Sequence, residues 1–178
     1  MKQFFQKFTL YDLILIASLS AIGLAIKPII NPMIHLISGP LRIPGGSLSG
    51  GFYMMWLALA RVIVNKPGSA FLFGLSQGIT VMLVGFFGSH GVFSIVSYSM
   101  PGLVVELFAI FFRGQSLFVL CVYSVVANLT GTIAVATVVM QLPLLMLTIS
   151  MLSSIFSGMM GGYFAEIVLT KLKKYKII

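Results

Sequence analysis

The sequence contains very few acidic residues: Asp12, Glu106 and Glu166 are the only ones among 178 residues. Charged residues of either sign make up 8% of the chain, whereas a soluble globular domain has about 25%. The three acids are far apart in the sequence and form no acid pair of the glycoside-hydrolase type. We expect no Ser-His-Asp set either, because the acids fall on the predicted cytoplasmic side and the histidines on the outer side. We therefore expect neither an enzyme nor a water-soluble domain.

The chain also lacks the residues that most cofactor sites need. Its single cysteine, Cys121, lies in an apolar run and is expected to be a small buried hydrophobe without a disulfide partner. His35 and His90 fall in outer loops where no carboxylate or thiol could complete a metal site. The glycine-rich stretch 43–51 lacks the Gly-Lys-Ser/Thr ending of a phosphate loop. We expect no metal, no cofactor and no ATP site.

Long apolar segments are what the sequence has instead, since 59% of its residues are hydrophobic. A membrane-spanning helix needs about 20 apolar residues. Six segments approach that length and are separated by short polar turns: residues 10–26, 47–64, 69–87, 92–112, 116–140 and 144–170. The sequence therefore predicts an all-α integral membrane protein, a single domain over residues 1–178 built as a bundle of six transmembrane helices.

The stretch 28–46 between the first two segments contains four prolines, too many for a spanning helix. We expect a long outer loop here. Because a long ordered loop on one face is usually a lid or a binding element, it would cover the outer mouth of the bundle.

The basic residues predict an orientation. If the N-terminus is cytoplasmic, nine of the 11 Lys and Arg lie on the cytoplasmic side and only Lys27 and Arg42 lie outside. This is a strong positive-inside pattern and places both termini of a multi-pass cell-membrane protein in the cytoplasm. The net charge of +8 therefore reflects topology, and we expect membrane lipid but no nucleic acid as a partner.

Polar and aromatic side chains near the outer side are the candidate ligand-binding residues. Tyr53 and Trp56 form either an aromatic belt at the membrane interface or a stacking wall for a planar ligand. Asn128 would be a buried amide within a membrane helix and needs partners. We expect the ligand to be bound by His35, Arg42, Tyr53, Trp56, His90, Tyr98 and Asn128.

Small residues spaced by four make smooth stripes along three helices. Ala17, Ala21 and Ala25 serve either contacts within the bundle or the docking of a separate membrane protein. The pairs Gly74 with Gly78 and Gly158 with Gly162 are expected to serve internal packing.

Glu106 is the only acid well inside a predicted span, which makes it a functional candidate by default. Its depth is toward the cytoplasmic half, where Arg61 and Arg113 also lie. An ion pair or a contact with a partner is therefore at least as good an interpretation as ligand binding.

The chain resembles the S components of energy-coupling factor (ECF) vitamin transporters over essentially its whole length. These proteins are six-helix bundles whose first helix carries an Ala-x-x-x-Ala stripe, as Ala17, Ala21 and Ala25 do here. Tyr53-Met54-Met55-Trp56 followed by Lys66-Pro67-Gly68 is similar to the branch that contains the hydroxymethylpyrimidine/thiamine S component. The turn at residues 88–91 does not match that branch.

The resemblance implies a subunit that captures a vitamin or vitamin precursor from outside. Its implied partners are an ECF coupling transmembrane subunit, which would dock on the alanine stripe, and two cytoplasmic ATPase subunits. A hydroxymethylpyrimidine or thiamine-type ligand is favoured, and a corrinoid such as cobalamin is the alternative. A different class remains open from the residues alone: an autonomous small membrane exporter, in which Glu106 would have to couple transport to protons.

Overall fold

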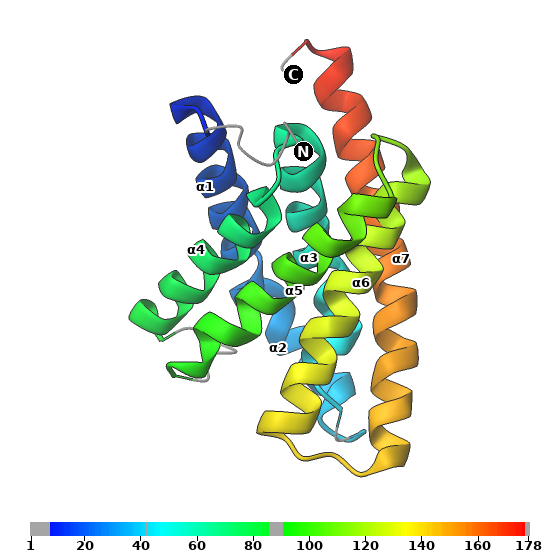
Figure 1. Ribbon diagram of the computed structural model, residues 1–178. Coiled ribbons are helices and arrows are strands. Elements are labelled where there is room, and N and C mark those ends of the chain that lie inside the picture. The colour runs from blue at the N-terminus through cyan, green and yellow to red at the C-terminus, as the bar shows by residue number, and fades with distance from the viewer. Residues whose placement is uncertain (1–7, 42, 86–90, 177–178) are drawn as a thin grey trace.

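The computed structural model describes residues 8–41, 43–85 and 91–176. Within these residues the secondary structure is helical throughout (Figure 1). The elements are α1 (Leu10–Ala25), α2 (Lys27–Ser38), α3 (Gly45–Val64), α4 (Ser69–Val84), α5 (Phe93–Phe111), α6 (Leu117–Ala134), the π-helical turn η2 (Val135–Val139) and α7 (Leu144–Lys174). The prediction of an all-α integral membrane bundle is confirmed, and each of the six predicted apolar segments coincides with a helix.

Four helices of the described chain are long and apolar enough to cross a membrane: α3, α5, α6 with η2, and α7. The pair α1 and α2 meets the same criterion together but is bent by 41°. Helix α4 is apolar but has 16 residues, about 24 Å at 1.5 Å per residue against a hydrocarbon core of about 30 Å. Six complete crossings therefore remain a prediction.

The segment predicted as a long outer loop is mostly helical, which corrects that expectation. Helix α2 covers Lys27–Ser38, and only the short connection to Gly45 is irregular. Pro28 lies in the first turn of α2. Backbone N–H groups in the first turn have no intrahelical acceptor, so the missing N–H of proline costs no hydrogen bond there. Pro32 lies inside the helix. The segment with the prolines is therefore a helix, separated from α1 by the 41° bend, and not an open loop.

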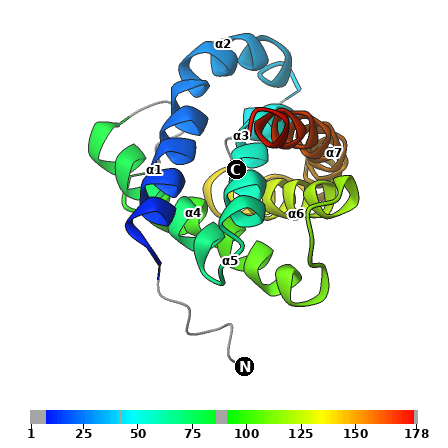
Figure 2. The same cartoon turned by 90° about the horizontal axis from the view of Figure 1, so that it is seen from above.

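Helix α3 lies at the centre of the bundle (Figure 2), where it contacts α1, α2, α4, α6 and α7. Close helix contacts depend on glycine: a Cβ on Gly161 would lie 2.3 Å from the Gly51 carbonyl oxygen, so α3 and α7 meet backbone to backbone. Added Cβ atoms at Gly74, Gly78, Gly158 and Gly162 would also meet neighbouring backbone below 3.0 Å. This confirms the prediction that both glycine pairs serve internal packing.

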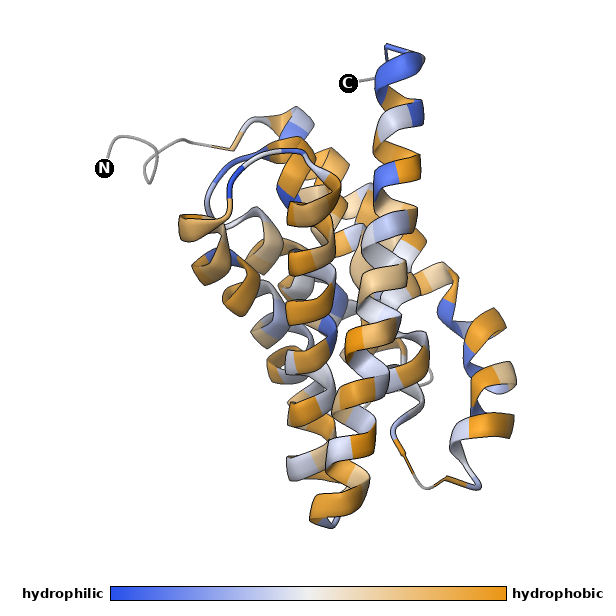
Figure 3. Ribbon diagram, turned by 90° about the vertical axis from the view of Figure 1, so that its right-hand side faces the viewer, coloured by the Kyte–Doolittle hydropathy of each residue, from blue (hydrophilic) through white to orange (hydrophobic). Residues whose placement is uncertain are grey.

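The surface of the bundle is largely hydrophobic along the helices, whereas hydrophilic residues gather at the C-terminal end of α7 (Figure 3). Large apolar side chains such as Leu83, Phe111 and Phe156 are exposed, as expected of residues in contact with lipid chains. We call the end where α1 begins and α7 finishes the basic end, because it carries Lys66, Arg113, Lys171, Lys173 and Lys174. The opposite end carries α2 and the turn from η2 to α7.

Asp12 and Glu106 each form an ion pair near the basic end in the part of the chain that the structure describes. Asp12, which also completes a capping box with Thr9 at the start of α1, lies 2.5 Å from the Lys66 ammonium. Glu106 lies 3.1 Å from Arg61 Nε and accepts a 2.8 Å hydrogen bond from the Ala70 N–H in the first turn of α4. Glu106 is therefore a structural carboxylate that joins α3, α4 and α5.

Glu106→Gln is expected to lower the free energy of unfolding by about 3 kcal/mol, because it leaves the Arg61 guanidinium buried without its counter-charge. The measurement is the thermal unfolding midpoint in detergent. Glu166→Gln removes the same charge from a carboxylate that accepts from the Thr170 hydroxyl, and serves as the matched control. Equal midpoints for the two variants would contradict the structural role of Glu106.

Candidate functional site

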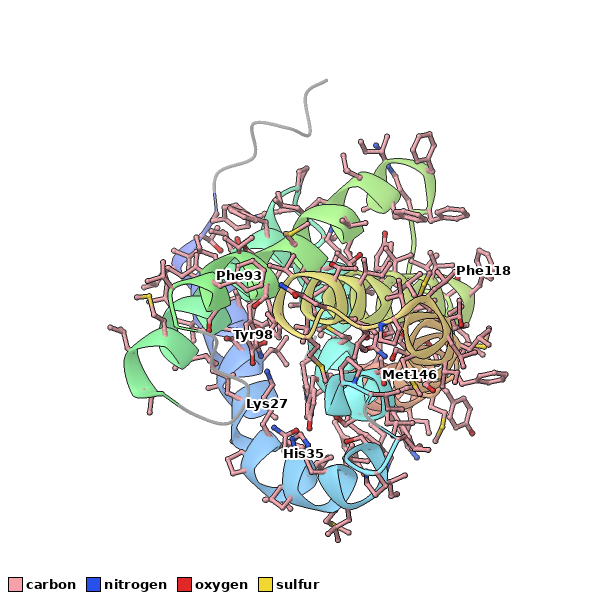
Figure 4. The ribbon with its side chains drawn as sticks, turned by 90° about the horizontal axis from the view of Figure 1, so that it is seen from below. Lys27, His35, Phe93, Tyr98, Phe118 and Met146 are labelled. Atoms are coloured by element: carbon pink, nitrogen blue, oxygen red, sulfur yellow. The ribbon has the colours of Figure 1, made fainter. Side chains whose placement is uncertain are left out.

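A cavity of about 630 Å³ opens among α2, α3, α5, α6 and η2, at the end of the bundle opposite the basic end. Figure 4 looks at this end and shows Lys27, His35 and Tyr98 around the central space between these helices. The polar part of the wall comes from Lys27, Asn31, His35, Ser38, Ser47, Tyr53, Ser97, Tyr98, Asn128 and Thr132. The volume of the cavity lies within the range of about 300–1,000 Å³ that is typical of small-molecule sites.

Helix α2 contributes one row of polar residues to this wall. Lys27, Asn31 and His35 are spaced by four, so they lie on one face of the helix, and all three line the cavity. The Tyr53 hydroxyl donates a 2.5 Å hydrogen bond to Asn31 Oδ1, which ties α3 to α2. The Lys27 ammonium donates a 2.9 Å hydrogen bond to the Tyr98 hydroxyl of α5. These two hydrogen bonds link the polar row of α2 to α3 and to α5.

Asn128 joins three helices beside the cavity. Its side chain is 2% exposed, and its Nδ2 donates to the Ser154 carbonyl oxygen of α7 at 2.9 Å and to that of Ser47 in α3 at 3.4 Å. Gly50 leaves the room for this amide, because a Cβ there would lie 1.6 Å from Asn128 Oδ1. The partners that a buried amide requires are therefore present.

The π-helical turn η2 shapes the wall next to α6. Val135, its first residue, lines the cavity together with Thr132, one turn earlier, and with Met140 and Leu142 of the turn that follows. Single π-helical turns inside α-helices often occur at functional sites because they shift the side chains that follow them. Here the π-helical turn contributes to the wall of the cavity.

The structure brings together four of the residues predicted to bind a ligand: His35, Tyr53, Tyr98 and Asn128. They come from four different helices and line the same cavity. Arg42 and His90, which were also predicted, lie outside the described residues.

Tyr53 lines the cavity and Trp56 does not, so the two rings predicted to form either an aromatic belt or a stacking wall do not face the cavity together. Residues three apart on a helix are offset by about 60° around its axis, which is enough here for Tyr53 and Trp56 to contact different neighbouring helices. The Trp56 ring packs on α1, where a Cβ on Gly23 would lie 3.3 Å from Trp56 Cδ1. Trp56 therefore contributes to helix packing.

Lys27 and Asn31 line the cavity but are not among the residues predicted from the sequence to bind a ligand. Lys27 was interpreted only as a topological charge, and Asn31 fell within the expected loop. A signal was present in the spacing of Lys27, Asn31 and His35 by four residues, which is typical of one helix face. The prolines on either side obscured that spacing.

The alanine stripe lies on the outside of the bundle. Ala17, Ala21 and Ala25 are all exposed on α1, whereas Gly23 between them is buried against Trp56 and Gln77. Contacts within the bundle therefore do not occupy the stripe in the described structure.

Metal-ligating residues do not cluster anywhere in the described part of the chain: no group of three His, Cys, Asp or Glu side chains could hold an ion. Of these residue types the cavity wall contains only His35. Hydroxyls, amides and one ammonium set in an otherwise largely apolar wall suit an organic ligand that accepts hydrogen bonds.

Comparison with known proteins gives one result. The model of the family described as "ABC-type cobalt transport system, permease component" matches residues 11–130, about two thirds of the chain. No curated protein and no solved structure matches the chain. The matched region runs from α1 to the Asn128 region of α6 and so includes most of the cavity wall. The chain therefore belongs to the family of ABC-type cobalt transport permease components and is a membrane component of an ABC-type transporter.

Proposed function

We propose that this chain is the substrate-capture subunit, or S component, of an ECF-type ABC importer. Its ligand would be a vitamin or vitamin precursor, with the hydroxymethylpyrimidine/thiamine type favoured by the resemblance of its motifs. The observation that carries the proposal is a cavity with a cluster of polar side chains in a largely apolar wall, at one end of an apolar bundle whose other end is basic. Membership of an ABC-type transport family supports it.

The proposed orientation places the cavity toward the outside. Lys and Arg favour the cytoplasmic side of membrane proteins, and Lys66, Arg113 and the lysines of the α7 end all lie at the basic end. Ligand would then enter the cavity beside α2. Helix α2 takes the place of the lid that was expected as a loop.

The size and chemistry of the cavity favour a compact organic ligand over the other candidates. A volume of about 630 Å³ accommodates a one- or two-ring heterocycle, whereas a corrinoid with its side chains is much larger. A free cobalt ion, as the family description suggests, would need several His, Cys or carboxylate ligands. Those residues do not converge in the described cavity.

The partners in this proposal are an ECF coupling transmembrane subunit and two cytoplasmic ATPase subunits. The exposed stripe of Ala17, Ala21 and Ala25 lets another helix approach α1 closely, which supports docking there. An autonomous exporter is less well supported, because Glu106 is engaged by Arg61 and the Ala70 N–H and lies away from the cavity. It is therefore poorly placed to carry protons alongside a substrate.

Copurification and uptake test the proposal together. The tagged chain, extracted gently from its native membrane, is expected to bring down two ATPases and a second membrane subunit. Uptake of labelled hydroxymethylpyrimidine or thiamine should require a catalytically intact ATPase. Uptake by the chain alone in vesicles that lack ATPases would overturn the proposed role.

A further inference from the structure

Lys27 brings a positive charge into the wall of the cavity. It is the first residue of α2, directly after the bend from α1, and it is 7% exposed. Its Nζ lies 2.9 Å from the Tyr98 hydroxyl, 4.0 Å from the centre of the Tyr98 ring and 5.1 Å from that of Tyr53. These aromatic partners stabilise a cation without neutralising it.

The chain has no acidic side chain available to pair with Lys27. Asp12 pairs with Lys66, and Glu106 pairs with Arg61. Glu166, near the end of α7, accepts from Thr170. All three acids lie in the described residues, and none of them lines the cavity. Any counter-charge for the Lys27 ammonium would therefore have to come from outside the chain.

A buried ammonium without a counter-charge is costly in a protein that lies in a membrane. Such a group is usually retained for a function, and here it faces a cavity of ligand size. An ammonium has three N–H bonds. In the part of the chain that the structure describes, the Tyr98 hydroxyl is the acceptor for one of them, which leaves donors that can be directed at a ligand.

We propose that the ligand carries an oxyanion, a carboxylate or a phosphate, which binds the Lys27 ammonium between Tyr53 and Tyr98. This inference rests on the proposed function and narrows its ligand to an anionic compound, which within the favoured type means a phosphate ester of hydroxymethylpyrimidine or thiamine. Asn31 and His35 continue the row along α2 and would contact the remainder of the ligand. A fixed positive charge, such as the thiazolium of thiamine, would be repelled from the same position.

The test compares pairs of ligands in which one member carries an oxyanion and the other does not. The pairs are hydroxymethylpyrimidine monophosphate with hydroxymethylpyrimidine, thiamine monophosphate with thiamine, nicotinate with nicotinamide, and biotin with biotinamide. Equilibrium binding to the purified chain in nanodiscs identifies the pair that binds. Within that pair the oxyanion is expected to bind about 10- to 100-fold more tightly, the range for a hydrogen bond to a charged group.

Lys27→Met should remove this preference, and Lys27→Arg, which keeps the charge, should retain most of it. Lys171→Met makes the same change in net charge at an exposed position on α7 and should leave the preference intact. A wild-type chain that binds the neutral or cationic member more tightly would overturn the inference. An unchanged preference in Lys27→Met would overturn it as well.

The two proposals fail in different ways. If the chain copurifies with ATPases and imports a cationic or neutral vitamin, the oxyanion inference is wrong and the capture role stands. If an oxyanion binds at Lys27 but uptake does not depend on ATPases, the capture role is wrong and the binding chemistry stands.

Discussion

Gly50→Ala is expected to abolish high-affinity ligand binding. The added methyl group would stand 1.6 Å from Asn128 Oδ1 and 2.4 Å from its Cγ, so the amide has to leave its position between α3, α6 and α7. Overpacking of this kind costs about 1–3 kcal/mol, and Asn128 also lines the cavity. We expect a fall in affinity of about 10- to 100-fold and a lower thermal unfolding midpoint.

Gly46→Ala is the matched control for this change. Gly46 lies on the same helix and lines the same cavity, but a Cβ there would meet no atom within 4 Å. The ligand affinity and the thermal unfolding midpoint of Gly46→Ala should stay at the wild-type values. The double variant Gly50→Ala/Asn128→Ala should unfold close to Asn128→Ala alone, because the smaller side chain removes the clash. A Gly50→Ala protein with wild-type affinity would show that the cavity is not the binding site.

Ala21→Leu is expected to stop uptake while leaving ligand capture unchanged. Ala21 is at the centre of the exposed stripe on α1, and a leucine there would hold a partner helix away from Ala17 and Ala25. The site lies on the outside of the bundle and does not line the cavity. We expect uptake by the complete transporter to fall about tenfold or more, since close packing drives helix association in lipid.

Thr148→Leu provides the control, because Thr148 is exposed on α7 and hydrogen-bonds only within its own helix. Uptake by this variant should equal that of the wild type. Ligand affinity of the isolated chain, measured in parallel, separates lost docking from lost capture. Normal uptake and normal ATPase copurification with Ala21→Leu would remove the stripe from the docking surface.

The helices could be predicted from the sequence because each is a long apolar run that ends at a turn signal. Asn65 and Gly68, for example, adopt positive φ angles of 49° and 92° between α3 and α4, as the Asn-Lys-Pro-Gly turn indicates. Helix α2 could not be predicted in this way. Its prolines resemble loop signals, although one of them lies in the first helical turn, where proline is tolerated.

The site was predicted in part, since residue type indicates which side chains need partners but not where each one points. Asn128 was expected to find partners and does so. Tyr53 and Trp56 are close in sequence, yet one lines the cavity and the other packs on α1. Lys27 could not be recognised from composition, because a lysine after an apolar run also fits a topological role. Only the arrangement of α2 against α3 and α5 places it in the cavity wall.

Native mass spectrometry of the purified chain, separated from every partner subunit, tests the capture role most directly. We expect one small organic molecule per wild-type chain, retained by Ala21→Leu and absent from Gly50→Ala. A folded wild-type chain that retains no such molecule and binds none of the vitamins offered to it would contradict the account.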